Sequence, residues 1–347
     1  MRRGFFLPVI KPFGMTSSRA VQIVKREVVK HGELGRKVKV GHAGTLDPRA
    51  TGVLTVAVGR ATRFIRFLRT EKRYTATFRI GVETDSDDLE GVVTRECAAP
   101  WVTRSRCEDV LTGFIGEQGQ VPPIFSAIRL DGARAYALAR SGRSDASEAE
   151  ALRERLAPRP ITIYSIDVLD WRGGDFPEVD VAIDCSRGTY IRSIARDFGR
   201  ALVDGGGAPA GCTLAALERT QCGAFTVDGA SALAPIDVER DALRGALAAD
   251  AVASIDDAMA HLRSVRLAPG KARDLRRGDA VEWWNALDAD LPSGASSVAA
   301  AAATAAGAAG AERGGGERAV RVVNTADERV HAVACVRRAR VEALVKA

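Results

Sequence analysis

Polar and hydrophobic residues alternate most regularly at 72–81, where the chain reads KRYTATFRIG. Tyr74, Ala76, Phe78 and Ile80 fall on one side of this stretch, which predicts a strand with one buried face. The apolar run VLTVAVG at 53–59 predicts a buried strand. Shorter runs predict strands or extended segments at 4–15, 92–95, 161–171, 178–185, 319–323 and 331–336.

Hydrophobic residues recur at helical spacing elsewhere. Thr16 or Ser17 offers an N-cap for a helix over 17–30, and further helices are expected within 103–115, 188–202 and 250–262. The residues expected to face inward are Val110, Leu111, Phe114 and Ile115 in the second helix, which would stop at Gly116, and Ile191, Ile194, Ala195 and Phe198 in the third. Strands and helices mix without a regular βαβ repeat, which favours an α+β fold.

The segment GHAGTLDPRATG at 41–52 is rich in glycine and proline and is expected to lack regular structure. It follows a polar loop and precedes the buried strand, so it can present Asp47 at the end of a sheet, where active sites often lie. Asp-Pro is also a common turn pair, so a simple turn-capping role for Asp47 explains the same residues.

The character of the chain changes after about residue 245. We expect a larger domain at 1–245 and a small β-rich domain at 246–347. Within the latter, the Ala/Gly-rich stretch at 295–316 has the composition of a flexible insertion.

Charge adds a hint of a polyanionic partner. Lys and Arg number 50 against 44 Asp and Glu, a net charge of +6, which is compatible with nucleic acid binding without proving it. A basic stretch places Phe64, Phe67 and Leu68 between cations, so one side can be buried while the other faces phosphates. Its cations are Arg60, Arg63, Arg66, Arg69, Lys72 and Arg73. A solvated helix face explains the same pattern.

Several classes of function are not supported. The six cysteines form no C-x-x-C pair and the four histidines no i, i+4 pair, so we expect no metal site and no disulfide framework. Phosphate-binding loops and dinucleotide fingerprints are absent, so no cofactor is expected. The N-terminal apolar run is broken by Pro8, Lys11 and Pro12, so we expect no signal peptide. No stretch reaches the roughly 20 apolar residues of a membrane span. We expect a cytoplasmic protein.

Five ordered motifs resemble those of the bacterial TruB-type tRNA pseudouridine synthases. They are KPFGMTSS (11–18), KVGHAGTLDPRATGVLTVAVGRATRF (39–64), KRYTATFRIGVETDSDDLEG (72–91), QVPPIFSAIRLDGARAYALARSG (120–142) and CSRGTYIRSIARDFG (185–199). The resemblance covers roughly residues 7–225. It implies a pseudouridine synthase fold, with a central mixed, mainly antiparallel sheet flanked by helices and a PUA-like RNA-binding domain at the C-terminus.

The resemblance also implies an activity: isomerisation of uridine 55 in the TΨC loop of tRNA to pseudouridine. Asp47 matches the essential aspartate, Tyr74 the aromatic that stacks on the target base and Arg192 the arginine that pairs with the aspartate. The remaining matches are Tyr190 lining the uracil pocket, His42 placed where the flipped base was and Leu217 in the pocket wall. Around Leu217 the sequence GGGAPAGCTLAALERT departs from the family's usual pattern.

The chemistry suits these residue types. A stacked uridine must leave its loop to be reached, at a cost of about a few kcal/mol, and stacking on an aromatic ring recovers about 1–3 kcal/mol. Breaking the C1′–N1 bond requires a nucleophile or stabilisation of positive charge, and an ionised carboxylate supplies either. The expected partner is the T arm of tRNA, bound by a single chain that needs no other protein.

Two other functions remain open at this point. A non-catalytic tRNA-binding or folding factor would use the same surface. A glycosidase would need Asp85 or Asp87 as a second carboxylate beside Asp47. Without the motifs, Tyr74 and Leu217 would be read as core residues and Arg192 as a surface residue.

Overall fold

The computed structural model describes residues 4–32, 34–126, 129–130, 133–134, 155–227, 236–249, 251–262, 264–267, 318–324, 330–337 and 340–346. The Ala/Gly-rich stretch at 295–316 lies outside these ranges, and so do residues 143–154. The chain forms two compact units. The first contains residues 1–47, 53–70 and 222–347, and the second contains residues 48–52 and 71–221.

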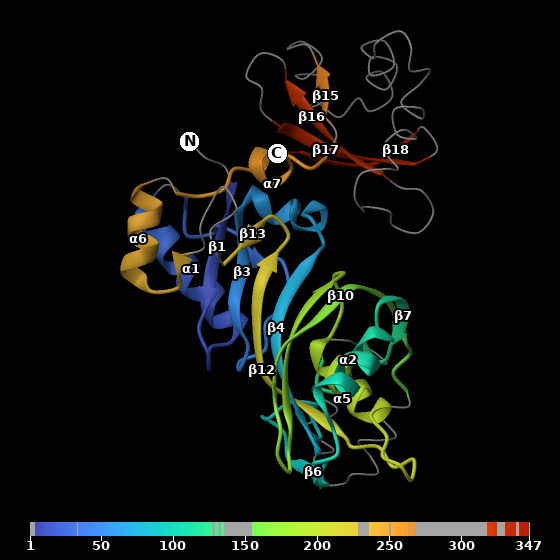
Figure 1. Ribbon diagram of the computed structural model, residues 1–347. Coiled ribbons are helices and arrows are strands. Elements are labelled where there is room, and N and C mark those ends of the chain that lie inside the picture. The colour runs from blue at the N-terminus through green and yellow to red at the C-terminus, as the bar shows by residue number, and fades with distance from the viewer. Residues whose placement is uncertain are drawn as a thin grey trace. The chain divides into compact units, whose positions relative to one another are not determined.

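In the first unit, strands pair in the order β14-β1-β3, and β2 adds to β3. β1 and β3 lie side by side in Figure 1. β1 pairs with β14 in parallel, whereas β2 and β3 are antiparallel. The elements here are β1 (Gly4–Lys11), α1 (Ser17–His31), β2 (Val40–His42), β3 (Thr51–Gly59), the 3₁₀ turns η1 (Arg60–Arg63) and η2 (Ile65–Phe67), β13 (Phe225–Thr226), β14 (Ile236–Asp237), α6 (Arg240–Ala248) and α7 (Ile255–Ala258).

The second unit has strands in the order β12-β4-β11-β10-β7. The pairs β4–β11, β11–β10 and β10–β7 are antiparallel, and α2 and α5 lie on one face of this sheet (Figure 1). The elements are β4 (Lys72–Ile80), β5 (Val82–Thr84), β6 (Val93–Glu96), α2 (Arg104–Thr112), β7 (Gly116–Gln120), β8 (Arg129–Leu130), β9 (Ala133–Arg134), β10 (Arg159–Arg172), β11 (Glu178–Cys185), α5 (Ile191–Ala201) and β12 (Cys212–Cys222).

A separate four-stranded sheet, in the order β15-β16-β17-β18, lies near the C-terminus. Its strands are β15 (Ser264–Leu267), β16 (Arg318–Asn324), β17 (Val330–Arg337) and β18 (Arg340–Lys346). The strands predicted at 319–323 and 331–336 are confirmed, and β18 was missed. The exact extent and PUA-like character of the 246–347 domain stay predictions.

Periodicity predicted the elements that have one face on a core. β4 buries Tyr74, Ala76, Phe78 and Ile80 as expected, and α5 buries its four predicted apolar residues. α1 begins after Thr16, whose side chain accepts a hydrogen bond from the N–H of Arg19. The mixed strand pairings and flanking helices confirm the α+β prediction.

Three local predictions were wrong. α2 ends at Thr112 instead of continuing to Gly116, so Ile115 is exposed and Cys107 takes the inner face with Leu111. The expected helix at 250–262 shrinks to α7, because Ser254 caps it and the chain leaves helical geometry at Met259. The segment 41–52 is irregular only from 43 to 50, since β2 and β3 extend into its ends.

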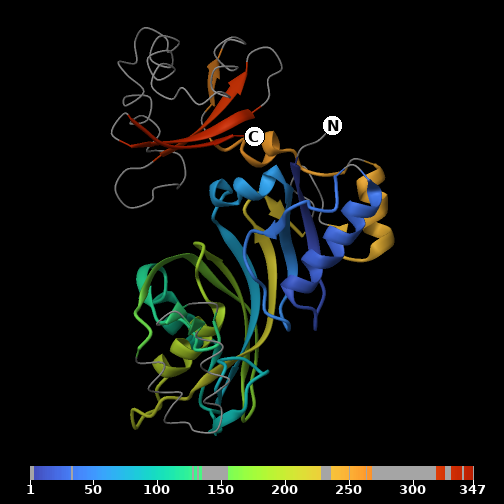
Figure 2. The ribbon, with the colours of Figure 1, turned by 180° about the vertical axis from the view of Figure 1, so that it is seen from behind.

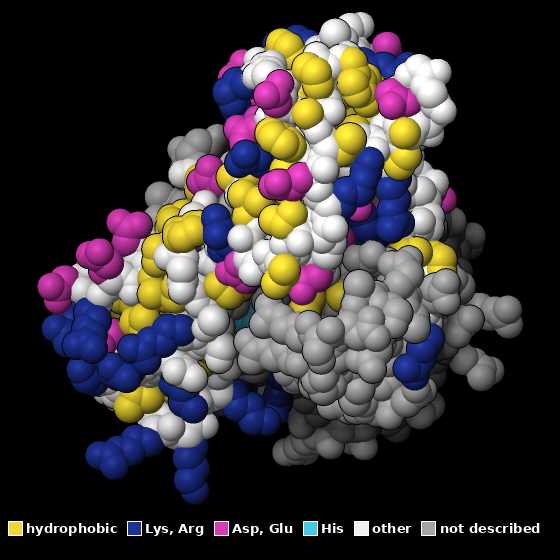
Figure 3. Space-filling view, turned by 90° about the horizontal axis from the view of Figure 1, so that it is seen from below, with side chains coloured by type: hydrophobic (Ala, Val, Ile, Leu, Met, Phe, Trp, Pro, Cys, Tyr) yellow, Lys and Arg dark blue, Asp and Glu magenta, His cyan; other side chains and the backbone are white. Residues whose placement is uncertain are grey.

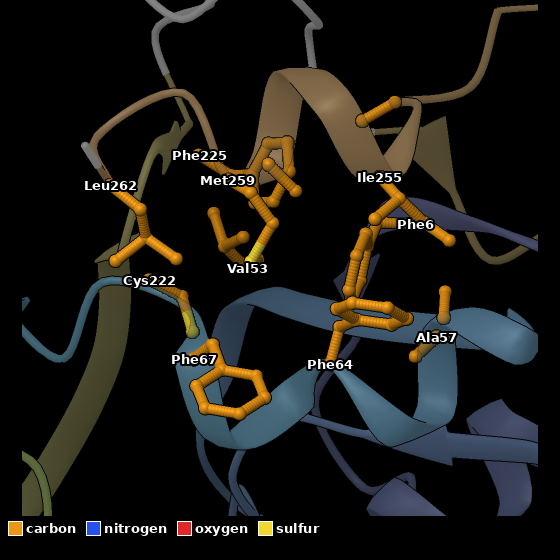
Figure 4. Close-up of a cluster of buried hydrophobic side chains, with 13 residues drawn as sticks. Phe6, Val53, Ala57, Phe64, Phe67, Cys222, Phe225, Ile255, Met259 and Leu262 are labelled. Atoms are coloured by element: carbon orange, nitrogen blue, oxygen red, sulfur yellow. The ribbon is translucent and has the colours of Figure 1, made fainter. Parts of the chain in front are cut away.

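The main core cluster of the first unit joins distant parts of the sequence (Figure 4). Phe6 of β1, Val53 and Ala57 of β3 and Phe64 between the 3₁₀ turns meet Met259 after α7. Phe64 and Phe67, the apolar residues of the basic stretch, are 0% and 8% exposed. Their burial turns Arg63, Arg66 and Arg69 outward, as the spacing predicted.

An ion pair joins α1 and α6, two helices of the first unit. α6 lies alongside α1 in both ribbon views (Figures 1 and 2), and Nε of Arg244 donates to the buried carboxylate of Glu27 at 2.9 Å. Burial alone would raise the pKa of Glu27, but the hydrogen bond and charge of Arg244, with Lys30 and Arg240, lower it below its usual 4.5.

No helix among the described residues is long and apolar enough to cross a membrane.

The ion pair of Glu27 with Arg244 predicts a pH-dependent stability. The folded-state pKa of Glu27 is lowered, so its contribution is fully present above pH 4.5 and is lost as the pH falls through the folded value. Thermal unfolding at pH 7 should show Glu27→Gln less stable than the wild type, and the difference should shrink as the pH is lowered stepwise below 4.5. Asp241→Asn is the control, because Asp241 is 96% exposed and contacts the same arginine. A difference between wild type and Glu27→Gln that is constant with pH would contradict this.

Candidate functional site

The Asp47 loop is fixed by hydrogen bonds just before the aspartate. Ser17 at the start of α1 is buried, and its Oγ accepts from the N–H of Leu46 and donates to the carbonyl of Leu46, both at 2.8 Å. Farther back, the N–H of Ala43 donates to the carbonyl of Thr55 at 2.9 Å. Asp47 is half-buried. The backbone just before it is held in place by these hydrogen bonds, so Asp47 does not lie in a loose turn.

His42 stabilises the bend that precedes this point. It is the last residue of β2, and its Nδ1 accepts a hydrogen bond from the N–H of Gly44 at 3.3 Å. Gly44 has φ of 136°, a conformation that favours glycine. His42 and Asp47 thus belong to the same rigid bend of the first unit, five positions apart.

Directly after Asp47 the chain enters the second unit for five residues. Thr51 and Gly52 pair in parallel with Glu218 and Arg219 of β12, and Nη1 of Arg49 donates to the carbonyl of Leu89 at 3.4 Å. Gly52 has φ of 98°, and a Cβ there would lie 2.2 Å from the carbonyl oxygen of Arg219. Only glycine fits this crossing.

A glycine-to-alanine pair tests this constraint. Gly52→Ala should destabilise the protein by more than about 2 kcal/mol, because it combines left-handed strain with a backbone clash. Gly32→Ala at the C-cap of α1 is the matched control: its φ is 86° but nothing lies within 4 Å of an added Cβ, so only about 1 kcal/mol is expected. Chemical denaturation measures both, and equal losses would contradict the clash argument.

The remaining predicted site residues lie in the second unit. Tyr74 of β4 is 5% exposed and pairs with Ile183 of β11. Tyr190 immediately precedes α5, and the Gln120 side chain binds its backbone. Nε2 of Gln120 donates to the carbonyl of Tyr190 at 3.1 Å, and Oε1 of Gln120 accepts from the N–H of Tyr190 at 2.8 Å. Leu217 of β12 is half-buried between two exposed neighbours.

Arg192 is not a surface residue. It is 5% exposed in the first turn of α5, and its Nη1 and Nη2 donate to the carbonyls of Ser86 and Phe125, both at 3.0 Å. Its Nε lies 3.6 Å from Oδ2 of Asp88. The predicted pairing of Arg192 with Asp47 joins residues of different units and stays a prediction, as do the roles of the other site residues.

The acidic stretch 85–88 has partners of its own. Oδ1 of Asp85 accepts from the N–H of Val92 at 2.8 Å, and Oδ2 of Asp87 lies 3.1 Å from Nη1 of Arg196. Burial lowers the pKa of the Arg196 guanidinium, but its hydrogen bonds and charge contacts with Asp197 and Asp87 outweigh this and raise it. Sequence reasoning missed Asp88 and Arg196; the available signal was a run of carboxylates and a helix with arginines four residues apart.

Exposed cations gather on the first unit. Figure 3 shows Lys and Arg side chains grouped in patches, with one dense group at the lower left. α1 and the loop after it expose Arg19, Lys25, Arg26, Lys30, Arg36, Lys37 and Lys39. Arg63, Arg66 and Arg69 are exposed as well, so the first unit offers many cations to a polyanion.

Comparison with known proteins decides the family. Residues 32–191 match the TruB family pseudouridylate synthase N-terminal domain. A tRNA pseudouridine synthase B of Gloeobacter violaceus is 42% identical over 276 residues, 80% of this chain and 86% of the relative. The chain belongs to the TruB family of pseudouridylate synthases. Family membership does not favour the glycosidase or the non-catalytic binding factor.

Other relatives and solved structures agree. A tRNA pseudouridine synthase B of Trichormus variabilis is 43% identical over 237 residues, 68% of this chain and 73% of the relative. A chain from the crystal structure of a Cbf5-Nop10-Gar1 complex has a TM-score of 0.61 at 23% identity, covering 96% of this chain and 78% of that chain. At that identity the likeness shows a shared fold.

Proposed function

We propose that this TruB-family enzyme isomerises uridine 55 in the TΨC loop of tRNA to pseudouridine. The observation that carries the proposal is the identity of 42% to a relative named tRNA pseudouridine synthase B. The match covers 86% of the relative's length. The substrate position rests on the resemblance of the five motifs. We further infer that a single chain acts in the cytoplasm on the T arm, without a cofactor or a protein partner.

Asp47 supplies the essential carboxylate in this proposal. The C1′–N1 bond breaks, the uracil turns, and C1′ bonds to C5; C5 loses its proton and N1 gains one, so the product is an isomer of the substrate. A carboxylate promotes this by attack or by stabilising positive charge at C1′. The anchoring of Leu46 by Ser17 supports the role, because a fixed backbone aims the neighbouring side chain.

Residues of the second unit receive and orient the base. Tyr74 stacks on the extruded uracil and Tyr190 lines its pocket, with Leu217 in the wall. Arg192 keeps the Asp47 carboxylate ionised through a charge-assisted bond. His42 occupies the place that the flipped base leaves. Support for Arg192 comes from its burial and its two carbonyl contacts, which hold the guanidinium in one orientation.

Replacement of the catalytic carboxylate tests the proposal. We expect Asp47→Asn to lower pseudouridine formation by at least about 1,000-fold, the scale on which loss of a catalytic residue acts. Tight tRNA binding should persist. Carbodiimide-dependent primer extension across the T loop of an unmodified transcript measures the product at position 55.

Asp85→Asn is the control, because an amide oxygen can still accept the N–H of Val92. This variant should stay active. A stop at position 55 with Asp47→Asn as strong as with the wild type would rule Asp47 out as the essential carboxylate. A wild-type protein that binds tRNA but gives no stop would favour a binding factor.

The basic stretch after β3 is expected to contact tRNA phosphates. Replacing Arg63, Arg66 and Arg69 together by Gln should weaken tRNA binding. The negative slope of log K against log salt should become shallower by up to about 2–3. Filter binding at salt concentrations from about 50 to 200 mM, where such contacts are screened, measures this slope. Arg104→Gln on α2, an exposed arginine paired with Glu108, is the control. Equal slopes for the triple variant and wild type would make this stretch an ordinary solvated face.

A further inference from the structure

α5 buries polar groups on a face where helices usually carry only apolar side chains. Arg192 and Arg196 lie one turn apart and are 5% and 6% exposed, and Ser193 between them is fully buried. Arginine is almost never buried without partners. We therefore expect specific hydrogen-bond and ion-pair partners for both arginines inside the second unit.

Arg192 bridges two segments that are separate in sequence. Its Nη1 binds the carbonyl of Ser86 in the 84–91 turn, and its Nη2 binds the carbonyl of Phe125 in the 121–126 segment. Its Nε faces Asp88 of the same turn at 3.6 Å. Its orientation thus depends on where these two segments lie.

Arg196 bridges the same two segments one helical turn farther along. Its Nη1 binds Oδ2 of Asp87 at 3.1 Å, and its Nη2 binds the carbonyl of Val121 at 2.9 Å. Ser193 also donates to that carbonyl at 2.9 Å. Asp197 fills the remaining side of the guanidinium, with a 2.8 Å bond to its Nε.

Asp87 stands between the two residues of the turn that contact Arg192. It is 3% exposed and is the non-glycine residue with positive φ, 61°, among the described residues. Asp tolerates this conformation better than most residues. Its carbonyl accepts the N–H of Leu214 in β12 at 3.1 Å, so backbone and carboxylate are both held.

We propose that Arg196 and Asp87 are positioning residues for the isomerisation, because their ion pair holds the Ser86 and Phe125 carbonyls in the places that aim Arg192. The inference rests on the proposed function, in which Arg192 serves Asp47. A buried ion pair adds little net stability but can fix geometry. A displacement of about 1 Å in a site can cost about 100-fold in rate.

The test measures kcat and KM for tRNA with Arg196→Met and Asp87→Asn. Asparagine keeps the left-handed backbone of residue 87, so the second variant retains the fold if the first does not. Each substitution should lower kcat by about 10- to 100-fold and leave KM within about twofold. The double variant should be no slower than the worse single variant, because the residues act as a pair.

Arg172→Met is the matched control. It breaks a charge cluster with Asp170, Glu178 and Asp180 in the same unit, and it should leave kcat unchanged. All rates are divided by the folded fraction from circular dichroism. An unchanged kcat in both test variants, or losses that vanish after this correction, would overturn the inference. An inactive wild type would instead refute the proposed function.

Discussion

The backbone crossing of Gly52 over Arg219 is the constraint on which the Asp47 region depends. Residues 48–52 join the second unit through the pairing of Thr51 and Gly52 with β12. Arg219 is itself fully buried, so the strand that Gly52 crosses is packed on this side chain rather than exposed. Asp47 is then held between two anchors: Ser17 fixes the residue before it, and this crossing fixes the chain after it.

Sequence periodicity succeeded where one face of an element meets a core. β4 and α5 present their apolar residues at the spacing of a strand and a helix, so their buried faces were predictable. Ile115 was misread because the helical spacing was continued past Gly113, where α2 has already ended. Helix ends depend on local capping and on the next strand, which periodicity does not contain.

The candidate site divides in the same way. The glycine- and proline-rich loop around Asp47 is visible in the sequence, but the catalytic role proposed for Asp47 rests on resemblance to a family. Neither periodicity nor the family resemblance identified Arg196, because a charged residue on a helix is usually assigned to the surface. Its partner Asp87 lies 109 positions away in the sequence. Spacing along a chain cannot reveal a buried charge pair formed across such a distance.

The 3₁₀ geometry after β3 also limits how this segment can change length. Three residues complete a turn of such a helix, so cations three apart share one side. Inserting one residue after Arg63 would rotate the downstream residues by about 120°, which would place Arg66 in the buried position of Phe67 and Phe67 in the half-buried position of Leu68. Inserting three would restore the alignment. Insertions and deletions in this segment should therefore be tolerated over evolution in multiples of three residues, because only those keep the cations and the aromatic rings on their own sides.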